Sequence, residues 1–333
     1  MSGLRLLSFT ERGKHLAERL GEKLGGQAFC TRDRENFSLR SWTEEAFASG
    51  DDLIFVGAVG IAVRAVAPFL KSKAQDPAVV AVDEGGSFAV PLVSGHLGGA
   101  NALAKRAAAV CGAVPVITTA TDVNGAFAVD LWAKKRNLTV MEPERIKLVS
   151  SKILAGVPAR VRSCCPVDGE MPAGVLPAGE TWDFEVGLFR TEGEILHLVP
   201  GAAVLGVGCR KGTPAETLER AFSGFCGKNS LFPQSICAAA TIDLKAEEQG
   251  LLDFCKAHGW PLSVFSAEEL NGVEGTFTPS EFVKKTTGVD NVCERSCVLC
   301  SGGTLAVRKY AGDGVTFALA MKPLKLDWSW KDE

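Results

Sequence analysis

The 333-residue chain lacks long basic runs, low-complexity tracts and internal repeats. Its 36 Lys and Arg residues are nearly balanced by 39 Asp and Glu residues, which leaves a formal net charge of −3. Non-specific nucleic-acid binding depends on clustered positive charge, so we exclude that class of function. The start of the chain also lacks the charged-then-apolar layout of a secretory signal, and we therefore expect a cytoplasmic protein.

Long apolar runs are also scarce, and only residues 53–70 could pass for a membrane span. This stretch carries a single charge, Arg64, but Gly57, Gly60 and Pro68 interrupt it. A span needs about 20 predominantly apolar residues. The stretch divides into a β-rich half and a helical half, which predicts a buried strand followed by a helix and no membrane segment.

The eleven cysteines are an odd number in a long chain, so we expect free thiols in a reducing cytoplasm. Cys293, Cys297 and Cys300 have the spacing that holds a four-iron cluster in radical S-adenosylmethionine enzymes. The same spacing marks one face of a helix on which cysteine acts as a small buried hydrophobe. We favour the helix and predict no protein-bound metal. An iron–sulfur radical enzyme stays open as an alternative, which an iron-free anaerobic preparation would exclude.

What the chain has in excess is glycine, with 36 residues, or roughly 11% against an average near 7%. Such a density without a collagen period predicts many tight turns at which the backbone approaches something closely. Apolar residues at 46% and charged residues at 23% are ordinary for a soluble globular chain. The length suggests two domains or three.

Short apolar runs alternate with segments of helical periodicity, a pattern that predicts an α/β fold with three-layer domains and mixed sheets. Gly85-Gly86 reads as a hairpin turn, which would set residues 88–93 antiparallel to residues 79–83. Thr10 is expected to cap a helix over 11–24, and Gly112 to close a helix over 98–111. The strands expected in the first half are residues 4–9, 28–31, 53–58, 79–83, 88–93 and 114–119.

Six prolines interrupt the segment between Leu138 and Gly201, where we expect one helix and several short strands. Strands and helices are expected to alternate again after residue 203. Thr213 is expected to cap a helix in a capping box with Glu216. A hairpin is expected around Gly312-Asp313-Gly314. The sequence thus predicts two main domains, 1–137 and 202–326, joined by a small module over 138–201.

Two glycine-rich turns lead from a strand into a helix. In the later one, between Gly206 and Gly212, the backbone N–H groups could hold an anion with the help of Arg210 and Lys211. A carboxylate fits there as well as a nucleotide, and a tight packing turn is the alternative. The earlier turn, Gly57 to Gly60, precedes Arg64, Lys71 and Lys73.

A third turn, Ser94 to Asn101, contains His96 among glycines at a helix N-terminus. Such a histidine is expected to resist protonation and to serve as a neutral base. The N–H groups at Gly98 and Gly99 could stabilise an oxyanion. The following strand is expected to run parallel and to end near Thr119 and Asp122, which places polar groups at the same sheet edge as His96.

These residues carry a resemblance to the cobalt-precorrin-5A hydrolase family of anaerobic cobalamin biosynthesis. The second half resembles that family's C-terminal domain, which in other organisms is a free-standing cobalamin-synthesis protein. The matching segments are, in chain order, residues 57–68, 71–73, 76–84, 91–101, 115–122, 206–213, 240–245 with Glu248, and 292–294.

The resemblance implies hydrolysis of a δ-lactone on a cobalt-containing tetrapyrrole, with loss of acetaldehyde. It implies His96 as the base and Asp122 as the orienting or relaying group. Cobalt arrives with the anionic substrate, so no cofactor is expected. The expected substrate-binding residues are Gly57, Gly60, Arg64, Lys71, Ser94, Gly98, Gly99, Asn101, Thr119, Gly208, Arg210 and Lys211.

The sequence leaves two points open. A non-catalytic corrinoid carrier or chaperone of the same pathway is the alternative function, and the chain is compatible with a homodimer. If Gly85-Gly86 is a hairpin, residues 57–60 and 83–84 fall at the sheet end opposite His96. The two groups of residues then cannot line one pocket unless the C-terminal domain folds over an edge.

Overall fold

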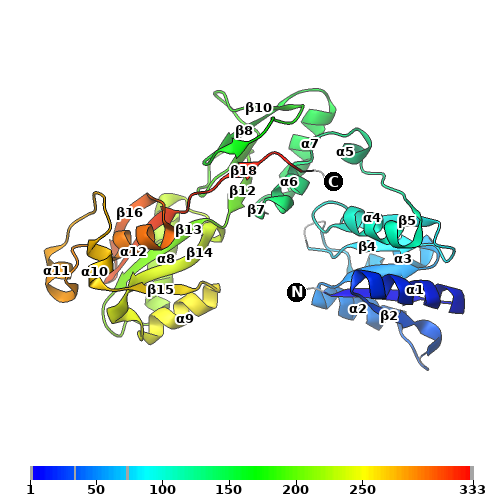
Figure 1. The fold of residues 1–333 in the computed structure, drawn as a ribbon, viewed down its shortest axis with the longest axis horizontal. Coiled ribbons are helices and arrows are strands. Elements are labelled where there is room, and N and C mark those ends of the chain that lie inside the picture. Colours follow the sequence, from blue (N-terminus) through cyan, green and yellow to red (C-terminus); the bar gives the residue numbers. More distant parts are fainter. Residues whose placement is uncertain (1–2, 34, 73–74, 331–333) are drawn as a thin grey trace. The chain divides into compact units, whose positions relative to one another are not determined.

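The computed structural model describes residues 3–33, 35–72 and 75–330 (Figure 1). The chain forms two compact units, Met1–Leu131 and Trp132–Glu333, and each unit is described by itself. Among the described residues, no helix combines the length and the apolar character that crossing a membrane requires.

The first unit contains a six-stranded sheet with the order β2-β1-β3-β4-β5-β6. Helices α1 and α4 pack on one face through residues such as Leu20 and Leu103, and α2 and α3 pack on the other through Trp42 and Ala62. The expected three-layer α/β architecture is confirmed. The strands are β1 (Leu4–Ser8), β2 (Gln27–Cys30), β3 (Asp52–Val56), β4 (Val79–Val82), β5 (Phe88–Val93) and β6 (Val114–Pro115), and the helices are α1 (Glu11–Leu24), α2 (Leu39–Ser49), α3 (Val59–Val66), α4 (Ala100–Cys111) and α5 (Ala120–Val123).

The sheet is mixed, as predicted. Strands β3 and β4 are parallel, with Val56 beside Val82, whereas β4 and β5 are antiparallel, with Val79 beside Val93. The hairpin between β4 and β5 is confirmed, and β5 pairs parallel to β6. The C-terminal end of β5 therefore lies at the edge opposite the C-terminal ends of β3 and β4, and this placement decides which residues share a site.

Local signals locate most of these elements. Thr10 caps α1 by accepting a hydrogen bond from the N–H of Gly13, as expected, and Gly112 ends α4 in the left-handed region. Three details differ from the prediction: α2 has no counterpart in it, α4 begins two residues later, and β6 has only two residues because the chain leaves the sheet after Pro115.

The second unit begins with the C-terminal half of α6 (Val129–Lys135) and contains a five-stranded sheet with the order β10-β8-β11-β12-β7. The C-terminal segment returns to this region, where β18 (Leu326–Asp327) pairs with β9 (Val167–Asp168) and Trp328 stacks on Trp132 with ring centroids 4.8 Å apart. The other elements are β7 (Leu138–Val140), α7 (Ile146–Leu154), β8 (Ala159–Ser163), β10 (Val175–Pro177), β11 (Phe184–Val186) and β12 (Leu196–Pro200). The division of the chain into three domains stays a prediction.

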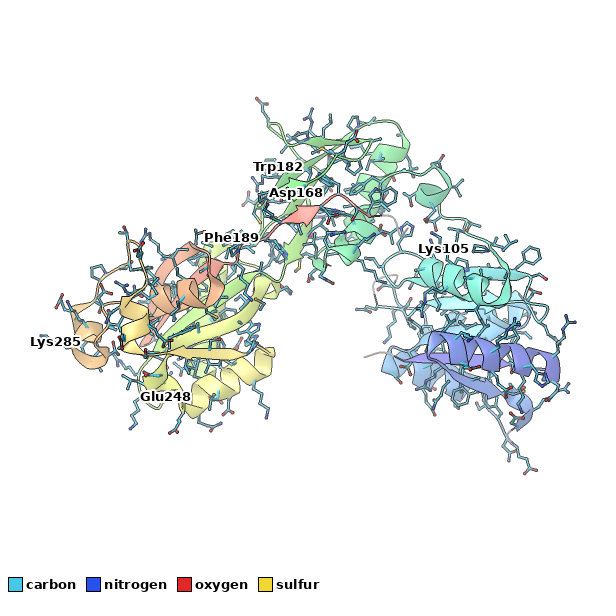
Figure 2. The ribbon with its side chains drawn as sticks, viewed as in Figure 1. Lys105, Asp168, Trp182, Phe189, Glu248 and Lys285 are labelled. Atoms are coloured by element: carbon cyan, nitrogen blue, oxygen red, sulfur yellow. The ribbon has the colours of Figure 1, made fainter. Side chains whose placement is uncertain are left out.

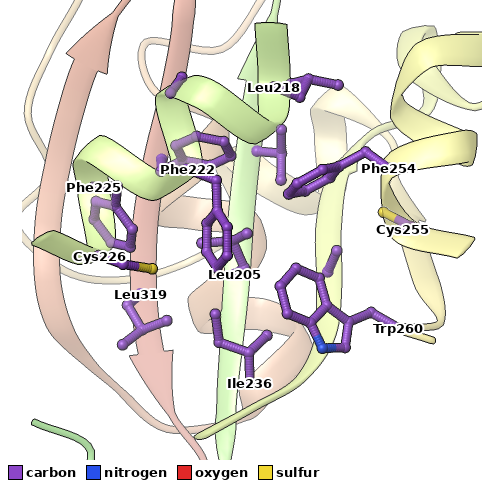
Figure 3. Packing of buried hydrophobic residues seen from close by; sticks show 14 of the residues in the cluster. Leu205, Leu218, Phe222, Phe225, Cys226, Ile236, Phe254, Cys255, Trp260 and Leu319 are labelled. Atoms are coloured by element: carbon purple, nitrogen blue, oxygen red, sulfur yellow. The ribbon is translucent and has the colours of Figure 1, made fainter. Parts of the chain in front are cut away.

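A second five-stranded sheet in this unit has the order β15-β14-β13-β17-β16. Helices α8 and α9 cover one face through a core that includes Phe222, Phe254 and Trp260 (Figure 3), and α12 covers the other. The strands are β13 (Ala203–Cys209), β14 (Ile236–Ile242), β15 (Leu262–Phe265), β16 (Thr304–Gly312) and β17 (Val315–Met321), and the helices are α8 (Ala215–Asn229), α9 (Gln249–His258), α10 (Ala267–Asn271), α11 (Glu281–Thr287) and α12 (Val292–Ser301).

Three sequence-based expectations for this sheet have clear outcomes. The hairpin of β16 and β17 is confirmed, and so is the helix that carries the three cysteines. Cys293 and Cys297 are buried against the sheet as small core residues. The capping box at Thr213 is wrong, because α8 begins after Pro214 and the Thr213 hydroxyl instead donates to the carbonyl of Arg210.

Candidate functional site

The imidazole of His96 lies between two carboxylates in the first unit. Its Nε2 is 2.6 Å from Oδ2 of Asp122, and its Nδ1 is 3.2 Å from both carboxylate oxygens of Asp130. The side chains of Asp130, His96 and Asp122 are 8%, 10% and 19% exposed. The three groups thus form a line of hydrogen bonds that leads from a buried acid to a more accessible one.

The turn between β5 and α4 holds His96 in place. Ser94 has a left-handed backbone with φ of 58°, and its carbonyl accepts the N–H of Ala100. Gly98 packs so closely on Ser94 that a Cβ atom would overlap the serine side chain. Only a glycine fits at position 98, which explains that residue by packing. Its proposed part as an oxyanion donor stays a prediction.

Asn101, at the start of α4, forms hydrogen bonds with two other predicted site residues. Its Nδ2 donates to Oγ1 of Thr119 and to Oδ2 of Asp122, each at 3.0 Å. The structure therefore brings together four of the predicted residues, His96, Asn101, Thr119 and Asp122, at one edge of the sheet. The parallel pairing of β5 with β6 is the physical reason, because it carries both chain segments to that edge.

The protonation expected for His96 is contradicted. Burial lowers the pKa of His96, but the hydrogen bonds and negative charges of Asp130 and Asp122 outweigh burial and raise it above the ordinary value of 6.5. With a carboxylate at each ring nitrogen, the imidazolium donates two hydrogen bonds. The surroundings of His96 therefore favour the protonated ring, which is opposite in direction to the neutral base expected at a helix N-terminus.

Two hydroxyl groups from the same turns are buried without a hydrogen-bond partner among the described residues. They are Oγ of Ser94, two residues before His96, and Oγ1 of Thr121, next to Asp122. An unpaired buried hydroxyl costs free energy unless a water or a ligand completes it. The two hydroxyl groups therefore supply further hydrogen-bond donors and acceptors beside the predicted site.

The remaining predicted residues of the first unit divide between the two sheet edges. The N–H of Lys71 donates to the carboxylate of Asp76, whose carbonyl lies against Gly98, so Lys71 belongs to the edge of His96. Gly57 and Gly60 follow β3 and lie at the opposite edge, with the Arg64 guanidinium beside Gly60. The doubt raised by the hairpin is thus confirmed within this unit: Gly57, Gly60 and Arg64 do not line a pocket with His96.

In the second unit, the predicted anion-binding turn already holds a carboxylate of the protein. The N–H of Gly212 donates to Oε2 of Glu248 at 2.8 Å, and Lys245 donates to Oε1 at 2.9 Å. Glu248, labelled in Figure 2, has a pKa below its ordinary value, chiefly because of the hydrogen bond from Lys245. Arg210 and Lys211 are exposed beside it, and Gly208 packs on Thr316.

Asp130 is the residue that the sequence analysis missed. It lies in the first turn of α6, and the N–H of Leu131 donates to its Oδ1 at 3.0 Å. An acidic residue at the start of a helix is common. The sequence therefore gives no signal that would separate this residue from an ordinary helix start.

Comparisons with known proteins agree with this arrangement of two units. The family described as Cobalamin synthesis G N-terminal matches residues 41–122, and the family described as Cobalamin synthesis G C-terminus matches residues 203–320. The cobalt-precorrin-5A hydrolase of Salmonella typhimurium is 33% identical over 96% of this chain and 97% of its own length. The chain belongs to the cobalt-precorrin-5A hydrolase family. The resemblance noted in the sequence is thereby confirmed.

A second curated hydrolase and a solved structure also match over most of this chain. The hydrolase of Priestia megaterium is 32% identical over 86% of this chain and 82% of its own length. A solved structure, of a cobalamin biosynthesis protein G homolog from Sulfolobus solfataricus, is 22% identical with a TM-score of 0.41, and the match covers 96% of this chain and 97% of that one.

Proposed function

We propose that this chain opens the δ-lactone ring of cobalt-precorrin-5A and releases acetaldehyde to give cobalt-precorrin-5B. Family membership over nearly the whole chain supports this function over a non-catalytic carrier, because the full-length relatives are hydrolases by name. The observation that carries the chemistry is the contact of 2.6 Å between Asp122 and His96.

In this proposal Asp122 is the group that meets the water, since it is the most exposed member of the hydrogen-bonded line. Its carboxylate accepts a proton as the water oxygen bonds to the lactone carbonyl carbon. The ring C–O bond then breaks and leaves an alkoxide. As acetaldehyde departs, the electron pair of the broken C–C bond passes to the macrocycle carbon, which takes the proton from Asp122.

His96 has a different part from the one expected from the sequence. A fixed cation beside the reacting carbonyl stabilises the negative charge that develops on the lactone oxygen. Its Nε2–H also orients the Asp122 carboxylate. We therefore assign proton transfer to Asp122 and charge stabilisation to His96, which reverses the roles implied by the resemblance.

The substrate carries many carboxylates, which favours cationic anchors. Lys71 lies at the edge of His96 and suits this purpose. Arg210 and Lys211 are proposed to bind more distant carboxylates of the same macrocycle, whereas Arg64, with Gly57 and Gly60, lies at the sheet edge opposite His96 and is left out of this assignment. Cobalt is part of the substrate, so the proposed mechanism uses no resident cofactor. A cytoplasmic location and a homodimer remain proposals, and light scattering of the purified chain checks the second.

The test is turnover of cobalt-precorrin-5A by the purified chain, with acetaldehyde measured through NADH oxidation by alcohol dehydrogenase. Asp122→Asn and His96→Gln are expected to lower kcat by about 10²- to 10⁴-fold. His15→Gln, an exposed histidine on α1, is the matched control and should leave kcat unchanged. A chain that binds the corrinoid but releases no acetaldehyde would support the carrier function instead.

A further inference from the structure

We propose that Asp130 is a positioning residue of the reaction, which fixes His96 as a cation with Nε2 directed at Asp122. The proposal rests on the proposed function and adds to it a residue that neither the sequence motifs nor the family matches single out. The family match in this half of the chain ends at residue 122, eight residues before Asp130.

The geometry of Asp130 suits a residue that acts through its neighbour. Both of its carboxylate oxygens lie 3.2 Å from Nδ1 of His96, and the Leu131 N–H fixes one of them at 3.0 Å. The side chain is 8% exposed, the least of the three groups. A carboxylate so buried is placed to touch His96 and not the substrate.

Fixing Nδ1 determines what the other nitrogen can do. With Nδ1–H donating to Asp130, the ring plane is set and Nε2 points at Oδ2 of Asp122. Within the part of the chain that the structure describes, the charged groups that face His96 are Asp130 from α6 and Asp122 from α5, and both favour the protonated ring. Asp122 must also accept a proton during turnover, so Asp130 is the carboxylate that keeps its charge beside His96 throughout.

A purely structural role for Asp130 predicts a different set of results. It would lower the free energy of unfolding and the amount of active protein without changing how the activity depends on pH. A positioning role moves the protonation of His96 and the pH dependence of kcat together. The direction follows from the charge: loss of Asp130 lowers the pKa of His96, so the cation is lost at a lower pH.

The experiment compares the intact chain with Asp130→Asn by NMR titration and by kinetics. The chain has only four histidines, so the imidazole signals of the ¹⁵N-labelled protein can be assigned from single His→Gln variants. In Asp130→Asn we expect the His96 titration to move to lower pH. The alkaline limb of the kcat profile, where kcat falls as the pH rises, should move to lower pH with it. We expect kcat to fall by roughly 10- to 100-fold, by analogy with the loss of a carboxylate partner of a metal-binding histidine, with KM unchanged. Asp130→Glu should restore part of kcat.

The second unit offers a matched control of the same chemistry. Buried His197 has Nδ1 3.1 Å from Oε1 of Glu142, and Glu142→Gln removes that carboxylate. This variant should leave both the His96 titration and the kcat profile as they are in the unchanged chain.

Three outcomes would overturn the positioning role. They are an unmoved His96 titration in Asp130→Asn, a kcat profile that keeps its alkaline limb, and a shift confined to the acidic limb, which would make neutral His96 the active form. If the unchanged chain releases no acetaldehyde, the proposed function fails. The NMR titration still shows in that case whether Asp130 holds the charge on His96.

Discussion

The carbonyl of Cys293 lies directly on Gly206, so that a Cβ atom at position 206 would overlap the Cys293 backbone. Gly206 is in the middle of β13, and Cys293 is in the first turn of α12. Helix and sheet can approach this closely only where the strand has no side chain. Of the two readings that the sequence leaves open for this turn, anion binding and tight packing, close packing accounts for Gly206.

Gly206→Ala is therefore expected to destabilise the second unit by about 1 to 3 kcal/mol or more, because backbone rather than a flexible side chain must move. Gly227→Ala in α8 is the matched control. Apart from its chain neighbours and the helix backbone, no atom of the described residues lies within 4 Å of an added Cβ there, and alanine should stabilise the helix by about 1 kcal/mol. Urea unfolding of both variants measures the two effects. Equal stability of Gly206→Ala and the unchanged chain would contradict the packing argument.

Much of the architecture follows from local patterns in the sequence. The apolar runs of β3 and β4, the Gly85-Gly86 turn and the Ala-rich α4 determine strand, hairpin and helix through neighbouring residues alone. The same patterns place His96 and Asp122 at one sheet edge, since the connection by α4 makes β5 and β6 parallel.

The protonation of His96 and the return of the C-terminal segment depend on distant residues. Asp130 lies 34 residues after His96, and nothing in its own neighbourhood marks it as a partner. The helix N-terminus that was expected to keep His96 neutral is a weaker influence than two adjacent carboxylates. Likewise, Trp328 stacks on Trp132, a contact between opposite ends of the second unit, next to the pairing of β18 with β9.

The cysteines should differ in reactivity. Burial raises the pKa of the Cys293 and Cys255 thiols to about 11. The hydrogen bond from Cys164 lowers the pKa of the buried Cys165 thiol to about 7, and the same hydrogen bond raises the pKa of the exposed Cys164 thiol above its ordinary value. Because the thiolate is the reactive form, iodoacetamide at pH 7 should label the Cys164–Cys165 pair first and Cys293 only after unfolding.

Peptide mass spectrometry after timed labelling checks this order, and Cys164→Ser with Cys165→Ser removes the fast phase. The same preparation, made without oxygen, should be colourless and free of iron. Stoichiometric iron that protects Cys293, Cys297 and Cys300 from labelling in unfolded protein would restore the iron–sulfur alternative.

Asp51 should make the stability of the first unit depend on pH. Burial raises the pKa of Asp51, but the N–H of Gly3 at 2.6 Å and the Arg5 guanidinium at 2.7 Å outweigh burial and leave it below the ordinary 3.8. A carboxyl whose pKa is lowered by folding stabilises the fold above its unfolded pKa, and this stabilisation is lost as the pH falls through the folded pKa.

Asp51→Asn is thus expected to cost about 1 kcal/mol at pH 7, with a difference from the unchanged chain that shrinks below pH 3.8. Urea unfolding at a series of pH values measures it. Glu22→Gln, an exposed residue on α1, should change stability little at any pH. A difference for Asp51→Asn that stays constant with pH would show that its charge is not the cause.

Arg210 and Lys211 test whether the second unit takes part in binding the substrate. Both side chains are exposed at the end of β13, beside a turn whose Gly212 N–H and Lys245 are already taken by Glu248. If they anchor carboxylates far from the lactone, Arg210→Ala and Lys211→Ala should each raise KM by up to about fivefold and leave kcat unchanged. Added salt should reduce the difference between these variants and the unchanged chain, because exposed charges are screened.

Arg220→Ala removes an equal charge from an exposed pair with Asp313 and should leave KM unaltered. A fall in kcat at constant KM would instead place these two cations at the reacting carbonyl, since only interactions made in the transition state lower kcat in that way.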